Sequence, residues 1–136
     1  MATRVAINGF GRIGRCILRA IHERGLAEQL PVVAINEPAA LAGMAHLARF
    51  DSTHGPFPGT VVSEGDDLLI NGRRVQVTHA TTPEDVDWSS TGADLVLECS
   101  GSFRHRAEAE RYLAAGAPRL LIAHPMADAA DVDATV

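Results

Sequence analysis

Hydrophobic residues form two kinds of segment that alternate along the chain. Short continuous runs predict strands buried on both faces, as in the interior of a parallel sheet. These runs are Arg4–Asn8, Pro31–Asn36, Leu95–Cys99 and Arg119–His124. Segments in which hydrophobic residues recur every three or four positions predict amphipathic helices. These segments are Gly11–Glu23, Ala39–Phe50 and Phe103–Ala115.

The first helical segment has the clearest pattern. Ile13, Ile17 and Ile21 recur at i, i+4 and i+8 and form one apolar face, and Gly25 is typical of the residue after a helix end. The polar side carries Arg15, Arg19 and Glu23. The predicted contacts of the other two helices are Leu41, Met44 and Leu47, and Ala107, Tyr112 and Leu113.

Turn-forming residues divide the remaining segments. Asn71-Gly72 lies between the β-prone runs Leu68–Ile70 and Arg73–Val77, and such a pair predicts a hairpin because both turn positions need a positive φ. Glycine and proline residues predict a loop over Asp51–Gly59 and a helix or turn start at Thr82–Asp85.

The order of these elements predicts the α/β class, with a doubly wound parallel sheet in a single domain that spans residues 1–136. Ligands of such sheets bind at the carboxyl ends of the strands, where the strand order reverses. We therefore expect the loops that leave these ends to meet at one crevice. These loops are at Gly9–Gly11, Glu37, Ser100-Gly101 and Ala123–Pro125.

Gly9, Gly11 and Gly14 lie between the first strand and the first helix with the spacing G-x-G-x-x-G, which suits the pyrophosphate of a dinucleotide. The first glycine permits a tight turn, the second leaves room for the phosphates, and the third lets the helix pack on the strand. The helix N-terminus is expected to face the phosphates. Arg12 and Arg15 are unfavourable there for the helix dipole unless an anion binds; the alternative is that both are solvated.

Glu37 ends the second strand, 23 positions after Gly14 (37 − 14), close to the spacing of about 20 expected for an acidic residue that binds the ribose. A carboxylate there accepts both ribose hydroxyls of NAD and repels the extra phosphate of NADP. The alternative is a solvated glutamate at a strand end.

Composition excludes several other classes of function. Hydrophobic residues make up 46% of the chain and the net charge is −5 with no basic stripe, so a core forms and nucleic acid is not the expected partner. No apolar run approaches the roughly 20 residues of a membrane span, and the N-terminus is not that of a secretory signal. The two cysteines, Cys16 and Cys99, form no disulfide or zinc pattern, so we expect a cytoplasmic protein.

Two other interpretations of the sequence, a hydrolase triad and a metal site, have less support than a cofactor site. Asp51, Ser52 and His54 are the residue types of a hydrolase triad, but neighbours in sequence rarely reach that geometry. His46, His54 and Asp51 fit no zinc spacing.

The sequence leaves two alternative roles for each of two residues at strand ends. Cys99 is either a thiol near the cofactor or a core residue, and His124 either contacts a ligand or caps its loop.

Five motifs in this order resemble the N-terminal half of the phosphorylating glyceraldehyde-3-phosphate dehydrogenase family along the whole chain. They are VAINGFGRIGR at 5–15, VVAINE at 32–37, FDSTHG at 50–55, LECSG at 97–101 and AAGA at 114–117. Some details resemble the erythrose-4-phosphate dehydrogenase branch. These are Glu37 in place of the more common Asp, Met44–Leu47, His124-Pro125 and Asp133–Val136.

The resemblance implies a Rossmann fold, NAD as cofactor, and a parent enzyme that oxidises a phosphorylated sugar aldehyde through a cysteine thioester, with phosphate or water releasing the acyl group. It implies a homo-oligomer, which in the family is a tetramer. In this chain the phosphate turn and the backbone that holds the pyrophosphate are then Gly9, Gly11, Arg12, Ile13 and Gly14. Glu37 binds the adenosine ribose, Ser100 and Gly101 line the nicotinamide side, and Phe103 flanks the adenine or its loop.

The sequence departs from the family at two positions near the cofactor. Ala123 stands where the family usually has Ser, and Ala80-Thr81 where it often has Glu-Arg. The family's Ser-Cys-Thr-Thr-Asn motif, which carries the catalytic cysteine, does not occur, so no catalytic residue is assigned. We therefore expect the cofactor domain of a dehydrogenase, inactive alone. The alternatives are a stand-alone NAD-sensing or assembly module, and another Rossmann enzyme such as a semialdehyde dehydrogenase.

Overall fold

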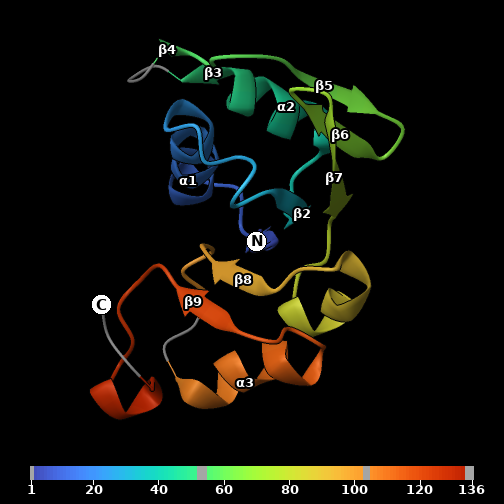
Figure 1. Cartoon of the computed structure of the whole chain (residues 1–136). Coiled ribbons are helices and arrows are strands. Elements are labelled where there is room, and N and C mark those ends of the chain that lie inside the picture. The colour runs from blue at the N-terminus through green and yellow to red at the C-terminus, as the bar shows by residue number, and fades with distance from the viewer. Residues whose placement is uncertain (1, 52–54, 103–104, 134–136) are drawn as a thin grey trace.

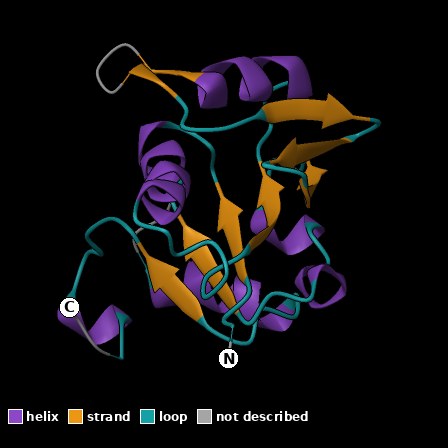
Figure 2. Cartoon of the chain, turned by 45° about the horizontal axis from the view of Figure 1, so that its top comes forward, coloured by secondary structure: helices purple, strands orange, loops and turns teal. Residues whose placement is uncertain are grey.

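The computed structural model describes residues 2–51, 55–102 and 105–133, and shows a sheet with helices on both sides (Figures 1 and 2). The parallel strands are β1 (Val5–Asn8), β2 (Val32–Asn36), β7 (Arg73–Thr78), β8 (Leu95–Glu98) and β9 (Leu120–Ile122). The α-helices of the described residues are α1 (Arg12–Glu23), α2 (Leu41–Arg49) and α3 (Arg106–Ala114). Short 3-10 helices are η1 (Pro83–Asp85), η2 (Trp88–Thr91) and η3 (Ala129–Asp131).

The strand order is β5 (Val61–Glu64), β6 (Asp67–Ile70), β7, β2, β1, β8 and β9, which confirms the predicted doubly wound arrangement. From β1 the chain passes through α1 to β2 on one side, and after β7 it returns to β8 on the other side. The order therefore reverses at β1, and the carboxyl ends of β1 and β8 form the switch point at which such sheets bind ligands.

The sheet is buried by two separate cores. Val5 and Ile7 of β1 point into the larger core, with Leu18 of α1 and Met44 of α2. Ala6, between them, points into the second core, as alternation along a strand requires. That second core contains Trp88 and Tyr112, both 0% exposed, with ring centroids 5.8 Å apart. Each face of the sheet is thus covered by its own hydrophobic layer.

One edge of the sheet is antiparallel, which the sequence interpretation captured only in part. The hairpin predicted at Asn71-Gly72 is confirmed, since both residues have a positive φ between β6 (Asp67–Ile70) and β7. The neighbouring β5 (Val61–Glu64) was not predicted. Within the predicted loop Asp51–Gly59, the short strands β3 (Phe50–Asp51) and β4 (Gly55–Pro56) pair with each other.

Arg19 was placed wrongly on the exposed side of the first helix. It is 8% exposed, because its guanidinium reaches across α1 to the start of β4. It donates to the carbonyl oxygens of Gly55 (2.9 Å) and Pro56 (2.5 Å), and pairs with Glu23 at 2.7 Å. A partner 36 positions later along the chain therefore decides the burial of this side chain.

The predicted faces of the other two helices need correction. Leu47 and Leu113 are 46% and 47% exposed, and Ala107 is exposed. Small residues one or two positions away are buried instead, Ala45 and Ala48 in α2 and Ala109 in α3. None of the helices in the described ranges combines the length and apolar character needed to cross a membrane.

Candidate cofactor site

Three turns meet at the switch point of the sheet: the glycine turn after β1, the turn after β2 and the turn after β8. The N–H of Gly9 donates to the carbonyl of Asn36 at 2.8 Å, and the N–H of Cys99 donates to the carbonyl of Asn8 at 2.8 Å. The turns that the sequence placed at one crevice are therefore joined by backbone hydrogen bonds.

The structure requires glycine at two positions of the glycine turn. Gly9 has a φ of +93°, and a Cβ there would lie 2.7 Å from the backbone nitrogen of Ser100. A Cβ on Gly14 would collide with the carbonyl oxygen of Gly9. The first glycine thus allows the turn and its contact with the neighbouring loop, and the third allows α1 to pack against that turn, as predicted from the spacing.

Gly11 differs, because no protein atom needs the space beside it. A Cβ on Gly11 would meet nothing within 4 Å, and its φ of −81° is accessible to other residues. The space beside Gly11 is open, which is what the approach of a diphosphate to the backbone requires. The turn therefore fits a dinucleotide.

The N-terminus of α1 suits an anion. Its N-cap residue is Gly11, which has no side chain to accept a hydrogen bond, and the first turn holds no acidic residue. Arg12 and Ile13 are exposed there. The first N–H groups of a helix lack partners within it, so they can donate to phosphate oxygens. Arg15 instead donates to the carbonyl oxygen of Phe10 at 3.1 Å, and this hydrogen bond stabilises the glycine turn.

Glu37 is held by two backbone amides. Its Oε1 accepts from the N–H of Phe10 at 2.8 Å, and its Oε2 accepts from the N–H of Ala39 at 3.0 Å. The side chain is half-buried, and each carboxylate oxygen can accept more than one hydrogen bond. The glutamate predicted to bind ribose is thus fixed against the glycine turn with acceptor capacity left over.

His79, which the sequence interpretation did not consider, holds the same turn from the other side. Its Nδ1 lies 2.8 Å from the carbonyl oxygen of Glu37 and 2.9 Å from that of Ala39. Both partners accept, so Nδ1 carries the proton in this arrangement. No sequence signal pointed to it, because the contact depends on the pairing of β2 with β7.

Ser100 and Gly101 form an exposed turn directly after β8. Their N–H groups donate inward to Oε2 of Glu98, at 3.1 and 3.0 Å, and Gly101 has a φ of +69°. Phe103, the other residue predicted on this side, lies outside the described residues. The turn lies against the glycine turn, since the backbone of Ser100 borders Gly9.

Glu98 is a buried carboxylate at the end of β8 that the sequence interpretation missed, 0% exposed. Its Oε1 accepts from side-chain groups of Asn8 (2.9 Å), Ser100 (2.6 Å) and Tyr112 (2.6 Å). Burial alone would raise the pKa of Glu98, but the hydrogen bonds that it accepts outweigh burial and lower it. The signal that could have found it is a charged residue ending an apolar run.

His124, which the sequence left open, pairs with this carboxylate. Its Nε2 lies 3.0 Å from Oε2 of Glu98, and its side chain is 13% exposed. Its contact to a neighbouring strand end favours the second of the two readings, a residue that fixes the loop after β9.

Neither cysteine has the surroundings of a nucleophile. Burial, and then the charge of Glu98, raises the pKa of the Cys99 thiol to about 12, so it is protonated at neutral pH. Cys16 lies within α1, and both thiols are free. Among the described residues, no three potential ligands stand together as a metal site, and His54 lies outside them.

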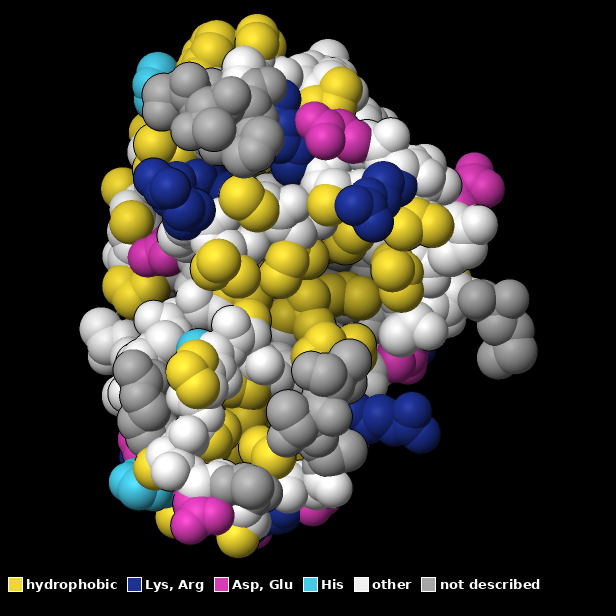
Figure 3. All heavy atoms as spheres, turned by 90° about the vertical axis from the view of Figure 1, so that its left-hand side faces the viewer, with side chains coloured by type: hydrophobic (Ala, Val, Ile, Leu, Met, Phe, Trp, Pro, Cys, Tyr) yellow, Lys and Arg dark blue, Asp and Glu magenta, His cyan; other side chains and the backbone are white. Residues whose placement is uncertain are grey.

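The face on the left-hand side of Figure 1 is hollowed at the level where α1 lies above β8. Figure 3 shows hydrophobic side chains lining this hollow and basic side chains, all of them arginine in this chain, on its upper rim. An apolar hollow with positive charge at its border suits a ligand with flat rings and phosphates.

The sequence model of the family described as glyceraldehyde 3-phosphate dehydrogenase, NAD binding domain, matches residues 3–106, more than half of the chain. The chain belongs to this family. Its fold is accordingly the Rossmann-type NAD-binding domain of a glyceraldehyde 3-phosphate dehydrogenase family oxidoreductase, and its cofactor is NAD. The match includes the turns after β1, β2 and β8.

Proposed function

We propose that this chain is the cofactor-binding domain of an NAD-dependent dehydrogenase that oxidises a phosphorylated sugar aldehyde. The junction between Glu37 and the glycine turn carries the proposal. The N–H of Phe10 fixes the carboxylate at the place where the spacing of Gly9, Gly11 and Gly14 puts the cofactor. NAD bound at this site accepts the hydride that leaves the substrate carbon.

Each part of the site has its own role in holding the cofactor. The N–H groups at Arg12 and Ile13 bind the diphosphate beside the open space at Gly11. Glu37 accepts the hydroxyls of the adenosine ribose and, as an anion, disfavours the 2′-phosphate of NADP. Ser100 and Gly101 line the nicotinamide side, and Phe103 flanks the adenine or the loop around it.

Calorimetric titration with NAD and NADP tests this proposal. We expect NAD to bind and NADP to bind at least about ten times more weakly, because of repulsion from the carboxylate. Glu37→Ala should weaken NAD about tenfold, or roughly 1.4 kcal/mol, and narrow the difference between the two cofactors. Glu28→Ala, which removes an 88% exposed carboxylate, is the matched control. A folded protein that binds no NAD at millimolar concentration would overturn the proposal.

The catalytic cysteine is proposed to lie outside this domain. The family's Ser-Cys-Thr-Thr-Asn motif is absent from the sequence, and the raised pKa of Cys99 supports no nucleophilic role for it. The domain alone should then bind NAD without oxidising an aldehyde, in the cytoplasm, where its free thiols stay reduced. Formation of NADH by the isolated domain would contradict this assignment.

Erythrose 4-phosphate is the proposed substrate, with glyceraldehyde 3-phosphate as the alternative. Support comes from the resemblance to the erythrose branch at Glu37, Met44–Leu47 and His124-Pro125. In the natural protein that contains this domain, the ratio kcat/KM should be higher for erythrose 4-phosphate. A higher ratio for glyceraldehyde 3-phosphate would assign the protein to the other branch.

A stand-alone NAD-sensing or assembly module is the second candidate. The gene sequence beyond the codon of Val136 discriminates between the two. A reading frame that continues into Ser-Cys-Thr-Thr-Asn supports the dehydrogenase, and a stop codon supports the module.

As implied by the family resemblance, the parent protein is proposed to be a homo-oligomer. Light scattering of that protein measures its oligomeric state.

A further inference from the structure

The carboxylate of Glu98 is held by donors from separate parts of the chain. β1 contributes Asn8, α3 contributes Tyr112, and the turn after β8 contributes three groups from Ser100 and Gly101. All five are N–H or O–H groups directed at the two oxygens, and Nε2 of His124, from the loop after β9, also lies 3.0 Å from Oε2. A carboxylate can only accept, so the pocket is specific for its charge and not merely for its shape.

The donor and acceptor roles of the next side chains along the carboxyl edge of the sheet follow from these hydrogen bonds. Since Glu98 only accepts, Asn8 must direct its NH₂ group to it, and its Oδ1 then accepts from Nδ2 of Asn36 at 2.8 Å. The Oδ1 of Asn36 in turn accepts from the N–H of Ala80 at 2.9 Å and from Thr78 Oγ1 at 2.7 Å. These side-chain hydrogen bonds run from β8 to the end of β7, and none of them is made by Glu37 or by the glycine turn.

We propose that Glu98 is the positioning residue of the cofactor site, and that its buried carboxylate holds the Ser100-Gly101 turn in the form that receives the nicotinamide half of NAD. The inference rests on the proposed function. The inward N–H groups of Ser100 and Gly101 are fully used by Glu98, so the outer surface of the turn is fixed before the cofactor arrives. A preformed surface avoids the ordering cost of binding.

This role predicts different effects of Glu98 on the binding of the two halves of the cofactor. The diphosphate and adenosine ribose rest on the glycine turn and Glu37, whose hydrogen bonds do not involve Glu98. Loss of the Glu98 charge should therefore weaken NAD but leave ADP nearly unchanged. A residue that only stabilises the fold would weaken both ligands together.

The test is calorimetric titration of Glu98→Gln with NAD and with ADP. The amide keeps the shape of the side chain but turns an NH₂ group toward N–H donors. We expect NAD affinity to fall at least about tenfold and ADP affinity to change by less than about twofold. Glu28→Gln, which removes an exposed carboxylate, should change neither. Equal losses for both ligands, or no loss for NAD, would overturn the proposal.

Tyr112→Phe provides a second variant in case Glu98→Gln does not fold. It removes one donor to Glu98 and the hydroxyl that accepts from Nδ2 of Asn8 at 2.6 Å, and it should weaken NAD about two- to fivefold without affecting ADP. Unchanged NAD affinity in this variant would contradict the inference.

The NMR amide shifts of Ser100 and Gly101 give an independent readout without ligand. They should move upfield in Glu98→Gln, because the acceptor of these charge-assisted hydrogen bonds loses its charge. If wild-type protein binds no NAD but the shifts move as expected, the proposed function fails while the positioning by Glu98 stands. If wild-type protein binds NAD and the shifts do not move, the inference about Glu98 fails alone.

Discussion

The backbone N–H of Phe10 donates a 2.8 Å hydrogen bond to Oε1 of Glu37, 27 positions later in the chain. The glycine turn and the end of the second strand are therefore one structural unit. The residue proposed to distinguish NAD from NADP is thus fixed by the same turn that is proposed to receive the diphosphate. Recognition of the ribose and of the phosphates should consequently be coupled.

The contact between Gly14 and the carbonyl of Gly9 predicts a steric effect on stability. Gly14→Ala should destabilise the fold by about 1–3 kcal/mol, because a Cβ would be forced into the turn. Gly43→Ala is the matched control, since it lies within α2 with nothing within 4 Å, and should stabilise by up to about 1 kcal/mol. Urea unfolding measures both changes, and equal effects of the two substitutions would contradict the contact.

The buried guanidinium of Arg19 predicts a large cost of truncation. Arg19→Ala should lower the free energy of unfolding by about 2–4 kcal/mol, because the carbonyls of Gly55 and Pro56 lose charged donors. Arg19→Lys should recover part of this loss, since one ammonium group cannot reproduce the planar fork. Arg24→Ala, at the exposed end of α1, should change stability by less than about 0.5 kcal/mol. An equally small effect at Arg19 would show that its contacts contribute little.

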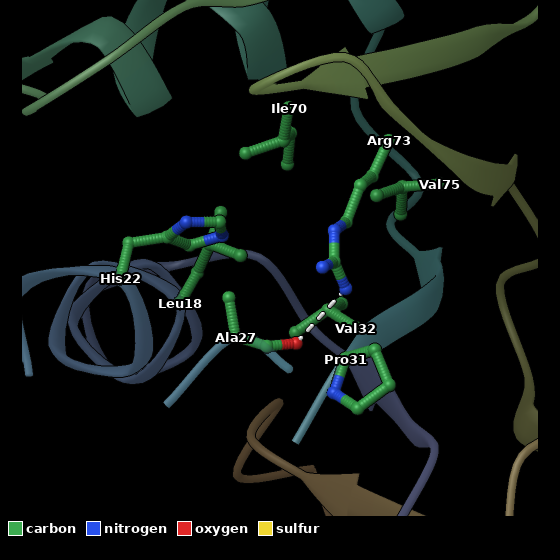
Figure 4. Close-up of a pocket in the computed structure, with 8 residues that line it drawn as sticks. All are labelled: Leu18, His22, Ala27, Pro31, Val32, Ile70, Arg73 and Val75. Carbon is green, nitrogen blue, oxygen red and sulfur yellow. Dashed lines mark hydrogen bonds between the residues drawn. The ribbon is translucent and has the colours of Figure 1, made fainter. Parts of the chain in front are cut away.

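His22 predicts a loss of stability in mild acid. It lines a small cavity opposite Arg73 (Figure 4), and burial, then the charge of Arg73, lowers the pKa of His22 below its ordinary 6.5. Asn71 Nδ2 lies 3.2 Å from its Nδ1 and donates to the neutral ring. The unfolded chain therefore binds this proton more readily, so the stabilisation is complete above pH 6.5 and is lost as pH falls through the lower folded pKa.

An NMR titration of the His22 ring measures that pKa directly. His22→Gln should make stability depend less on pH between 6.5 and the folded pKa. A midpoint at or above 6.5 in the folded protein would contradict the proposed burial of a neutral ring.

The raised pKa of Cys99 predicts an unreactive thiol. In a Cys16→Ser variant, which leaves a single cysteine, alkylation at pH 8 should be at least about a hundredfold slower than that of a free cysteine. The rate should continue to rise above pH 9, because the thiol is still largely protonated there. Rapid alkylation at neutral pH would restore Cys99 as a candidate nucleophile.

The sequence predicted those features that depend on local pattern. Apolar runs located β1, β2, β8 and β9, and the glycine spacing identified Gly9 and Gly14, at which the structure leaves no room for a side chain. Asn71 and Gly72 form the predicted hairpin because their backbone preference alone determines that turn. Such features require only neighbours in sequence.

Features that depend on distant partners were not predicted. Val61–Glu64 has little hydrophobic alternation and becomes a strand only by pairing with β6. The burial of Arg19 requires the segment at Gly55, and the role of His79 requires the pairing of β2 with β7. Glu98 left a signal, a charge at the end of an apolar run, but its partners come from β1, α3 and the loop after β9.

Titration of Gly11→Ala with NAD is the most direct test of the central claim, that the glycine turn after β1 holds the diphosphate of NAD. Because no protein atom lies within 4 Å of the added methyl group, the fold should remain intact, with a loss of at most about 1 kcal/mol from the changed N-cap. The methyl group occupies the space of the diphosphate, so NAD affinity should fall at least about tenfold relative to wild type. Wild-type affinity for NAD in this folded variant would contradict the account.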